Sequence, residues 1–150
     1  MNFSSLDLAP VLQQAIDACG YKKMTPIQQQ AIVVARRGRD VLASAQTGTG
    51  KTAAFAVPIL QQMLNKPKKT TPGTPRALIL TPTRELAEQL ATNIANYAQF
   101  TDISVTALYG GVTKALCLYR SVLQLYRTFV QKRVRVAVCF SFKPISQEQF

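Results

Sequence analysis

The glycine-rich stretch Ala45–Thr52, Ala-Gln-Thr-Gly-Thr-Gly-Lys-Thr, constrains the fold of this chain more than any other segment. It follows a short apolar segment, 41–44, and leads into helix-like sequence that begins at Ala53. A strand, a glycine loop and a helix in this order are the setting in which backbone N–H groups bind phosphate. Gly48 and Gly50 lack Cβ, so the backbone there can approach an anion closely. The segment predicts a phosphate-binding loop; the alternative is an ordinary glycine-rich turn before a helix.

The predicted ligand of this loop is a nucleoside triphosphate with Mg²⁺. The Lys51 ammonium would reach the β- and γ-phosphates, and the Thr52 hydroxyl would be the metal ligand. These two residues are the catalytic candidates. The loop residues expected to contact the nucleotide are Gln46, Thr47, Gly48, Thr49, Gly50, Lys51 and Thr52.

Apolar periodicity and turn residues predict alternating helices and strands along the rest of the chain. Gly20 is placed to end the first helix, and Thr25-Pro26 has the form of an N-cap followed by proline at the first helical position. Alternating strands and helices predict an α/β protein with a parallel sheet flanked by helices. The predicted helices cover 6–19, 25–34, 53–64 and 85–97, and the predicted strands cover 41–44, 77–80 and 103–108.

Composition narrows the class of protein further. No apolar run reaches the roughly 18 residues that a membrane span requires, so we expect no membrane partner. The three cysteines lack metal-ligand spacing and are interpreted as reduced thiols, which favours a cytoplasmic protein. With no histidine in the chain, catalysis would have to use carboxylates, Lys, Arg or a metal. Nothing in the sequence predicts an obligate oligomer.

The net charge of +11 suggests a polyanionic partner, and it is unevenly distributed. Residues 1–112 contain eleven Lys and Arg against six acids, whereas residues 113–150 contain seven against the single acid Glu148. The shorter C-terminal part therefore carries the larger share of the charge. We place a domain boundary near Val112, with a basic tail over 113–150.

Four motifs in order resemble the first half of a DEAD-box RNA helicase core, close to the bacterial RhlE-type subgroup. The resemblance covers residues 1 to about 112 and implies a partial RecA-like fold of the P-loop NTPase class, with ATP, Mg²⁺ and RNA as ligands. The phosphate loop begins with Ala45 rather than glycine, which is the form that this family prefers. The motifs are the Q-motif-like segment 20–28, the phosphate loop 45–52, the segment 82–87 and the pair 110–111.

The resemblance implies an adenine-binding role for the first of these segments. The Gln28 amide can both donate and accept, so it can pair with the N6 and N7 edge of adenine. Phe3, seventeen residues before Gly20, resembles the upstream aromatic that stacks on the base, and Lys22 lies within the same segment. The alternatives are that Phe3 is a core anchor and Gln28 a solvated helix residue.

RNA contact is implied for Thr83, Arg84, Gly110 and Gly111. Hydroxyl, guanidinium and free helix N–H groups bind phosphates without reading sequence, so this contact would be sequence-independent. Alternatively, Arg84 and Glu85 form only a surface pair, and the two glycines form only a turn.

The family pattern fails after Val112. The resemblance implies a Thr-Pro-Gly-Arg segment and then Asp-Glu-Ala-Asp, and these 150 residues contain neither. We therefore expect ATP hydrolysis by this chain alone to be close to nil. For the tail, three interpretations stand: a basic amphipathic helix for RNA or a membrane surface, a helix and strand (134–142) that complete the sheet, or out-of-frame translation. The abrupt loss of acids and of every later motif favours the third.

Three functions are compatible with these observations. The first is the ATP-binding lobe of an ATP-dependent RNA helicase, which would unwind RNA only in the intact protein. The second is a non-enzymatic ATP- or RNA-binding module that regulates a helicase or ribonucleoprotein. The third is another P-loop enzyme, such as a small-molecule kinase, against which the segments 20–28 and 82–87 argue.

Overall fold

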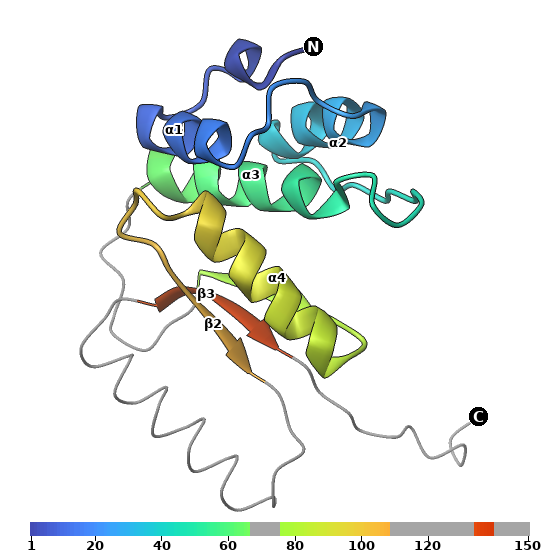
Figure 1. Cartoon of the computed structure of the whole chain (residues 1–150), viewed down its shortest axis with the longest axis vertical. Helices are drawn as coiled ribbons and strands as arrows, with labels where there is room; N and C mark the ends of the chain where they lie inside the picture. Colours follow the sequence, from blue (N-terminus) through green and yellow to red (C-terminus); the bar gives the residue numbers. More distant parts are fainter. Residues whose placement is uncertain (67–75, 109–133, 140–150) are drawn as a thin grey trace, which may run out of the picture.

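The computed structural model describes residues 1–66, 76–108 and 134–139 of the chain. The order of elements is four helical segments, one strand, one helix and two strands (Figure 1). The predicted tail helix and the pair Gly110-Gly111 lie outside the described residues. The elements are η1 (Phe3–Leu6), α1 (Pro10–Ala18), α2 (Pro26–Arg36), α3 (Lys51–Asn65), β1 (Ala77–Leu80), α4 (Arg84–Tyr97), β2 (Ser104–Leu108) and β3 (Val134–Cys139).

Local signals set the ends of the early helices as predicted. Gly20 has a positive φ of 79°, and its N–H bonds to the carbonyl of Asp17, so the chain turns away after α1. At the start of α2, Thr25 accepts a hydrogen bond from the Gln28 N–H, and the Gln28 side chain accepts one from the Thr25 N–H. This reciprocal capping box, with Pro26 at the first helical position, fixes where α2 begins.

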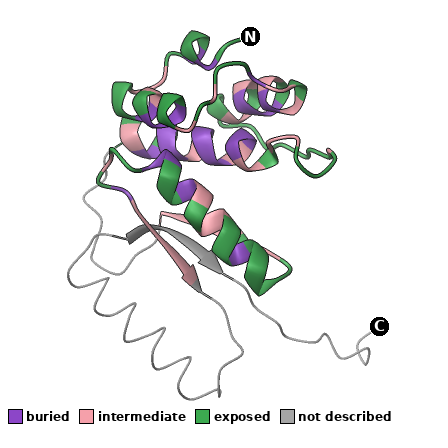
Figure 2. Cartoon of the chain, in the orientation of Figure 1, coloured by how far each residue is buried: buried purple, intermediate pink, exposed green. Residues whose placement is uncertain are grey.

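Helices α1, α2 and α3 form one layer, and α4 lies between that layer and the sheet (Figure 1). The buried side chains concentrate where α1 and α2 meet α3 and where α3 meets α4 (Figure 2). Removing these apolar side chains from water is the main favourable term that holds the layers together. The largest fully buried side chains are Phe3, Leu12, Ile16, Ile32, Leu60, Ile94, Gln28 and Val57.

The sheet has three parallel strands in the order β1-β3-β2. Strand β1 and strand β2 are therefore parallel as expected, but each pairs with β3 rather than with the other. Leu80 and Leu108 flank Cys139 at the carboxyl end of the sheet. Helix α4 covers one face, whereas Leu78 is 60% and Leu80 71% exposed.

Strand β3, which belongs to the C-terminal tail, is the central strand of the sheet. Val134 and residues 136–139 pair with strands from the body of the chain, as the interpretation in which the tail completes the sheet requires. The boundary near Val112 and the out-of-frame origin of the tail stay predictions.

The strand predicted over 41–44 is absent, and this prediction was wrong. Residues 39–46 have no regular structure, and Leu42 is fully exposed. A strand needs a partner for its N–H and C=O groups, and no described strand pairs with this segment. An apolar run therefore precedes the phosphate loop without entering the sheet.

Two tyrosines connect α4 to the segment that precedes α2. The hydroxyls of Tyr21 and Tyr97 lie 3.1 Å apart, and the two rings meet edge to face with centroids separated by 5.9 Å. Burial, and secondly the hydrogen bond to Tyr21, raises the pKa of Tyr97 well above its ordinary value. Tyr97 therefore stays protonated and holds the C-terminal end of α4 against the helical layer.

Candidate nucleotide-binding site

The phosphate loop runs directly into the N-terminus of α3. Gly48 and Gly50 have φ angles of 80° and 83°, in the left-handed region that glycine adopts without strain. Gly50 is the residue before the first helical position, Lys51, so the free N–H groups of the first helical turn lie next to the loop. Together with the helix dipole, these groups are suited to bind an anion, which is the role that the sequence predicts for this loop.

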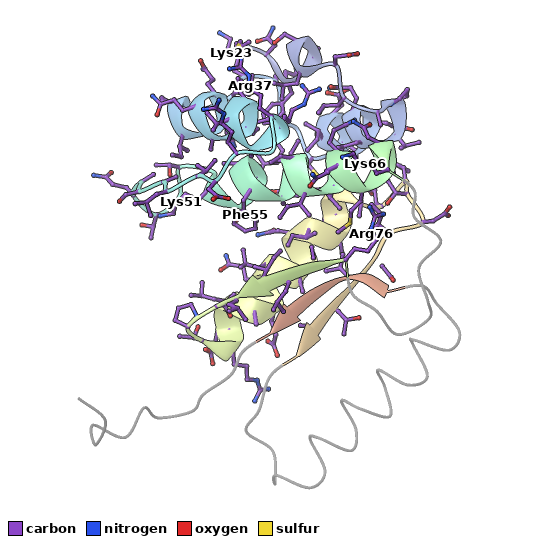
Figure 3. All side chains as sticks on the ribbon, turned by 180° about the vertical axis from the view of Figure 1, so that it is seen from behind. Lys23, Arg37, Lys51, Phe55, Lys66 and Arg76 are labelled. Carbon is purple, nitrogen blue, oxygen red and sulfur yellow. The ribbon has the colours of Figure 1, made fainter. Side chains whose placement is uncertain are left out.

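Two side-chain contacts close the loop on itself. The Thr49 hydroxyl donates to the carbonyl of Gln46 across 2.8 Å, and the Lys51 ammonium donates to the carbonyl of Ala45. Lys51 is exposed at the start of α3 (Figure 3). Its ammonium thus lies against the first residue of the loop.

Thr52 is half-buried in the first turn of α3, beside Lys51. Its hydroxyl is a suitable Mg²⁺ ligand, since Mg²⁺ is usually held by few protein groups together with phosphate oxygens and water. Within the described ranges, no group of three or more His, Cys, Asp or Glu side chains forms a metal site.

The Q-motif-like segment is bonded directly to the phosphate loop. The Thr25 hydroxyl donates to the carbonyl of Thr49 across 2.8 Å, and Gln28 Nε2 donates to the carbonyl of Gly50 across 3.2 Å. Gln28 is 1% exposed, so the alternative of a solvated helix residue is wrong. The start of α2 and the phosphate loop form one hydrogen-bonded unit.

The Gln28 amide retains one N–H and one oxygen lone pair beyond its bonds to Thr25 and Gly50. One donor and one acceptor are what the N7 and N6 groups of adenine require. Because Gln28 is 1% exposed in this structure, its contact with adenine stays a prediction.

Phe3 does not fit the adenine-stacking role implied by the resemblance. Its ring is completely buried in the core and lies 5.8 Å from the Tyr21 ring, centroid to centroid. In this structure Phe3 is packed as a core anchor, as the alternative has it, and stacking on a base would require the ring to leave the core. Lys22 is exposed, and its carbonyl accepts a hydrogen bond from the Phe3 N–H.

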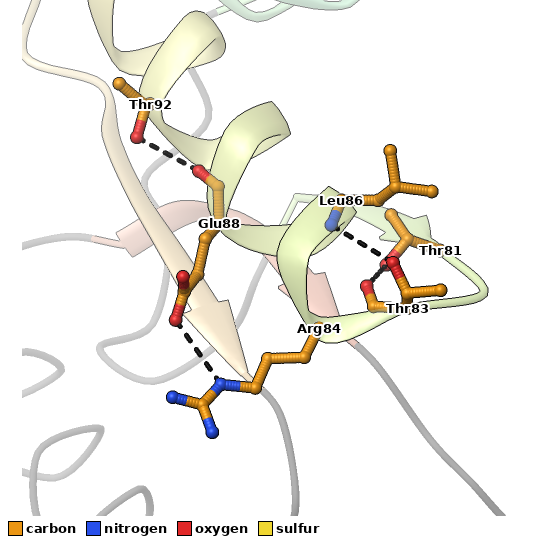
Figure 4. Close-up of polar contacts among 6 residues, drawn as sticks. All are labelled: Thr81, Thr83, Arg84, Leu86, Glu88 and Thr92. Atoms are coloured by element: carbon orange, nitrogen blue, oxygen red, sulfur yellow. Dashed lines mark hydrogen bonds and ion pairs between the residues drawn. The ribbon is translucent and has the colours of Figure 1, made fainter.

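The segment predicted to contact RNA forms the start of α4. Thr83 caps this helix by accepting a hydrogen bond from the Leu86 N–H at 3.2 Å, and the Thr81 hydroxyl donates to the Thr83 carbonyl (Figure 4). Arg84 pairs with Glu88 one turn further on, with 3.5 Å between Nε and the carboxylate oxygen. Both side chains are about half exposed, so the pair contributes little to stability and the guanidinium stays accessible.

The N-terminal ends of α3 and α4 point toward the same side of the molecule (Figure 1). The structure thus brings the loop, Thr25 and Gln28 into one cluster and places Thr83 and Arg84 on the same side, at the start of a separate helix. Two helix N-termini directed to one side favour two anionic ligands there.

Sequence comparison identifies the family. The DEAD/DEAH box helicase family profile matches residues 25–139, which is most of the chain. This chain belongs to the DEAD/DEAH box helicase family. The match extends through β3, beyond the boundary proposed near Val112.

Individual relatives agree with this assignment. The chain is 50% identical over 110 residues to the ATP-dependent RNA helicase SrmB of Haemophilus influenzae, covering 73% of this chain and 25% of that protein. It is 45% identical over 112 residues to the ATP-dependent RNA helicase RhlB of Pseudomonas aeruginosa, covering 73% of this chain and 28% of the relative. The narrower RhlE-type subgroup stays a prediction.

A solved structure shares the fold of this family member. It is described as a hypothetical ATP-dependent RNA helicase from Sulfolobus tokodaii, and it aligns with a TM-score of 0.69 at 31% identity over 89% of this chain and 34% of that one. The chain therefore has the partial α/β fold of the P-loop class, and it spans about a quarter to a third of the length of these three relatives.

Sequence reasoning missed Thr25 as a site residue. It was identified only as a helix cap, although its hydroxyl also bonds the phosphate loop. The signal was present, because an N-cap hydroxyl that accepts from the helix still has a proton to donate. The partner of that proton lies 24 positions away in the sequence, so only the structure could identify it.

Proposed function

We propose that this DEAD-box chain is the ATP-binding part of an ATP-dependent RNA helicase. The observation that carries the proposal is the position of Gln28, buried between the Thr25 N–H and the Gly50 carbonyl. This arrangement connects a side-chain amide that is able to recognise a base to a phosphate loop. An ordinary glycine-rich turn does not require such a connection. The names of the relatives, ATP-dependent RNA helicases, support the same ligands.

In this proposal Lys51 neutralises the β- and γ-phosphates, and the N–H groups at the start of α3 receive the same anion. Mg²⁺, which fits the Thr52 hydroxyl, would supply charge neutralisation on the phosphates. Thr83 and Arg84 bind the RNA backbone without sequence preference. The intact helicase would couple ATP hydrolysis to the unwinding of RNA duplexes.

For the 150-residue chain alone, we propose ATP binding with very little turnover. Phosphoryl transfer depends on positioned metal ligands and charge stabilisation, and an arginine finger alone contributes about 10³–10⁵ in rate. The acidic motif expected after Val112 is not in this sequence. A non-enzymatic ATP- or RNA-binding module remains the second candidate, because binding without turnover would serve a regulator equally well.

The location we propose is the cytoplasm, on the argument from reduced thiols. Within the described residues, Cys19 is a free thiol, and burial raises its pKa, which makes it less reactive. No helix in the described part of the chain is long and apolar enough to cross a bilayer.

Calorimetric titration with a non-hydrolysable ATP analogue and Mg²⁺ tests the proposal. The Lys51→Ala variant should lose detectable binding, because it loses the ammonium that faces the phosphates. Lys66→Ala, at the other end of α3, removes the same charge and should bind as the unaltered chain does. Unchanged affinity in Lys51→Ala would refute the phosphate-loop assignment.

A further inference from the structure

Positive charge in the described residues collects on the helical layer rather than at the start of α4. Residues 1–66 contain seven Lys and Arg against three acids, whereas residues 76–108 contain two against three. The segment predicted to bind RNA, at Thr83 and Arg84, thus belongs to the less basic part of the described chain. A polyanion would be attracted more strongly to the helical layer.

Four of these basic residues flank α2. Lys22 and Lys23 come shortly before its start, and Arg37 and Arg39 follow its end, all with exposed side chains. We call this set the α2 basic cluster. Within the described ranges, none of the four side chains forms an ion pair or a hydrogen bond with another residue.

The N-terminal segment contacts the chain at both ends of α2, at Lys22 and Lys23 before its start and at Arg36, the residue before Arg37, at its end. Asn2 and Phe3 pair with Lys23 and Lys22 through the backbone, whereas Arg36 donates from its guanidinium to the carbonyls of Leu6 and Asp7. The contacts made by Asn2 and Phe3 are separated along the chain from those made by Leu6 and Asp7 only by η1. Because a 3-10 helix rises about 2 Å per residue, the two sets of backbone contacts lie within about 10 Å of each other.

Figure 3 shows Lys23 and Arg37 at the same end of the molecule. Basic residues from both sides of α2 in the sequence are thus represented at one end of the molecule. A polyanion such as a nucleic-acid strand would be attracted to that end.

We propose that the α2 basic cluster is a second RNA-binding surface, which contacts the phosphate backbone away from Thr83 and Arg84. The proposal rests on the proposed function, since it takes RNA as the polyanion. The start of α4 lies at the opposite end of the molecule from the N-terminal segment (Figure 1). An RNA bound at both places would extend along the protein instead of touching one point.

The test uses the full 150-residue chain and a labelled single-stranded RNA of about 20 nucleotides, followed by fluorescence anisotropy over a range of salt. The variant carries Lys23→Gln, Arg37→Gln and Arg39→Gln, and it leaves Lys22 in place because that residue is a predicted nucleotide contact. A matched variant, Lys66→Gln, Lys68→Gln and Lys69→Gln, removes the same charge from the sequence that follows Asn65, the last residue of α3. The basic tail is common to both.

Loss of three backbone contacts should lower the slope of log affinity against log salt by about 2 and weaken binding roughly tenfold at low salt. The matched variant should change both values much less. Equal effects in the two variants would overturn the proposal, because net charge alone would then explain binding. So would the absence of RNA binding by the unaltered chain.

Two further measurements separate this inference from the proposed function. Binding of the ATP analogue should be unchanged in the cluster variant, and thermal unfolding should show that it remains folded. An Arg84→Ala variant reports on the start of α4. If it weakens RNA binding while the cluster variant does not, the second surface is wrong and the helicase assignment stands.

Discussion

Gln28 donates a hydrogen bond from its side-chain amide to the backbone carbonyl of Gly50, and the two residues are in contact at 3.2 Å. A Cβ built on Gly50 would lie 2.3 Å from the same Nε2 atom. Gly50 is therefore required twice, once for its positive φ and once for the space that Gln28 occupies. In the proposed function, base recognition and phosphate binding share this contact.

Gly50→Ala should destabilise the chain more than Gly48→Ala. Both substitutions place alanine at a positive φ, which costs about 1–2 kcal/mol. Only Gly50→Ala also pushes into a buried side chain, which adds about 1–3 kcal/mol, whereas a Cβ at Gly48 meets nothing within 4 Å. Urea unfolding of the two variants measures the difference.

The control for this prediction is a double variant. Replacing Gln28 by alanine in the Gly50→Ala background removes the clash, so the combined loss of stability should be smaller than the sum of the single losses. Strictly additive losses would show that the two side chains do not compete for the same space.

Thr25→Val should weaken nucleotide binding as well as stability. Valine keeps the shape of threonine but loses both the cap to Gln28 and the bond to the Thr49 carbonyl. The expected cost is about 1–2 kcal/mol in unfolding free energy. Affinity for the ATP analogue should fall because the loop loses one of its two attachments to the start of α2.

Thr83→Val provides the comparison, because Thr83 also caps a helix but has no described contact with the phosphate loop. It should lower stability by about 1 kcal/mol without changing affinity for the nucleotide. A Thr25→Val variant with unaltered affinity would argue against a positioning role for Thr25.

Stability at alkaline pH should depend on Tyr97. The pKa of Tyr97 is raised in the folded chain, so the folded state retains a proton that the unfolded state releases above about pH 10. The stabilisation is complete below that pH and is lost as the pH rises toward the folded-state pKa.

The Tyr97→Phe variant lacks this ionisation, and it should also be less stable at pH 8 by about 1 kcal/mol, the value of one hydrogen bond. Unfolding in urea at pH 8 and pH 11 should show a larger loss with pH for the unaltered chain than for the variant. Parallel pH profiles would mean that Tyr97 is not protected from ionisation.

The parts of the fold that the sequence predicted well are those set by neighbouring residues. Gly20 ends α1, and Thr25 with Pro26 starts α2, because caps and turns act within a few positions along the chain. The loop glycines adopt the positive φ angles that their lack of a side chain permits.

The parts that failed depend on partners far away in the sequence. The apolar segment 41–44 was predicted as a strand from its composition, but pairing decides whether a strand forms, and the sheet instead takes β3 as its centre. Phe3 was assigned to the base from its spacing to Gly20, whereas packing against Tyr21 buries it. The local sequence pattern shows neither that β3 would be the central strand nor that Tyr21 would pack against Phe3.

A pair of titrations, with non-hydrolysable ATP and GTP analogues, on the unaltered chain and on Gln28→Ala tests most directly whether Gln28 recognises adenine. If Gln28 reads adenine beside the phosphate loop, the unaltered chain binds the ATP analogue more tightly, and the variant loses that preference together with part of its affinity. Gln29→Ala, on the same helix, should retain the preference. Equal preference before and after Gln28→Ala would show that Gln28 does not read adenine.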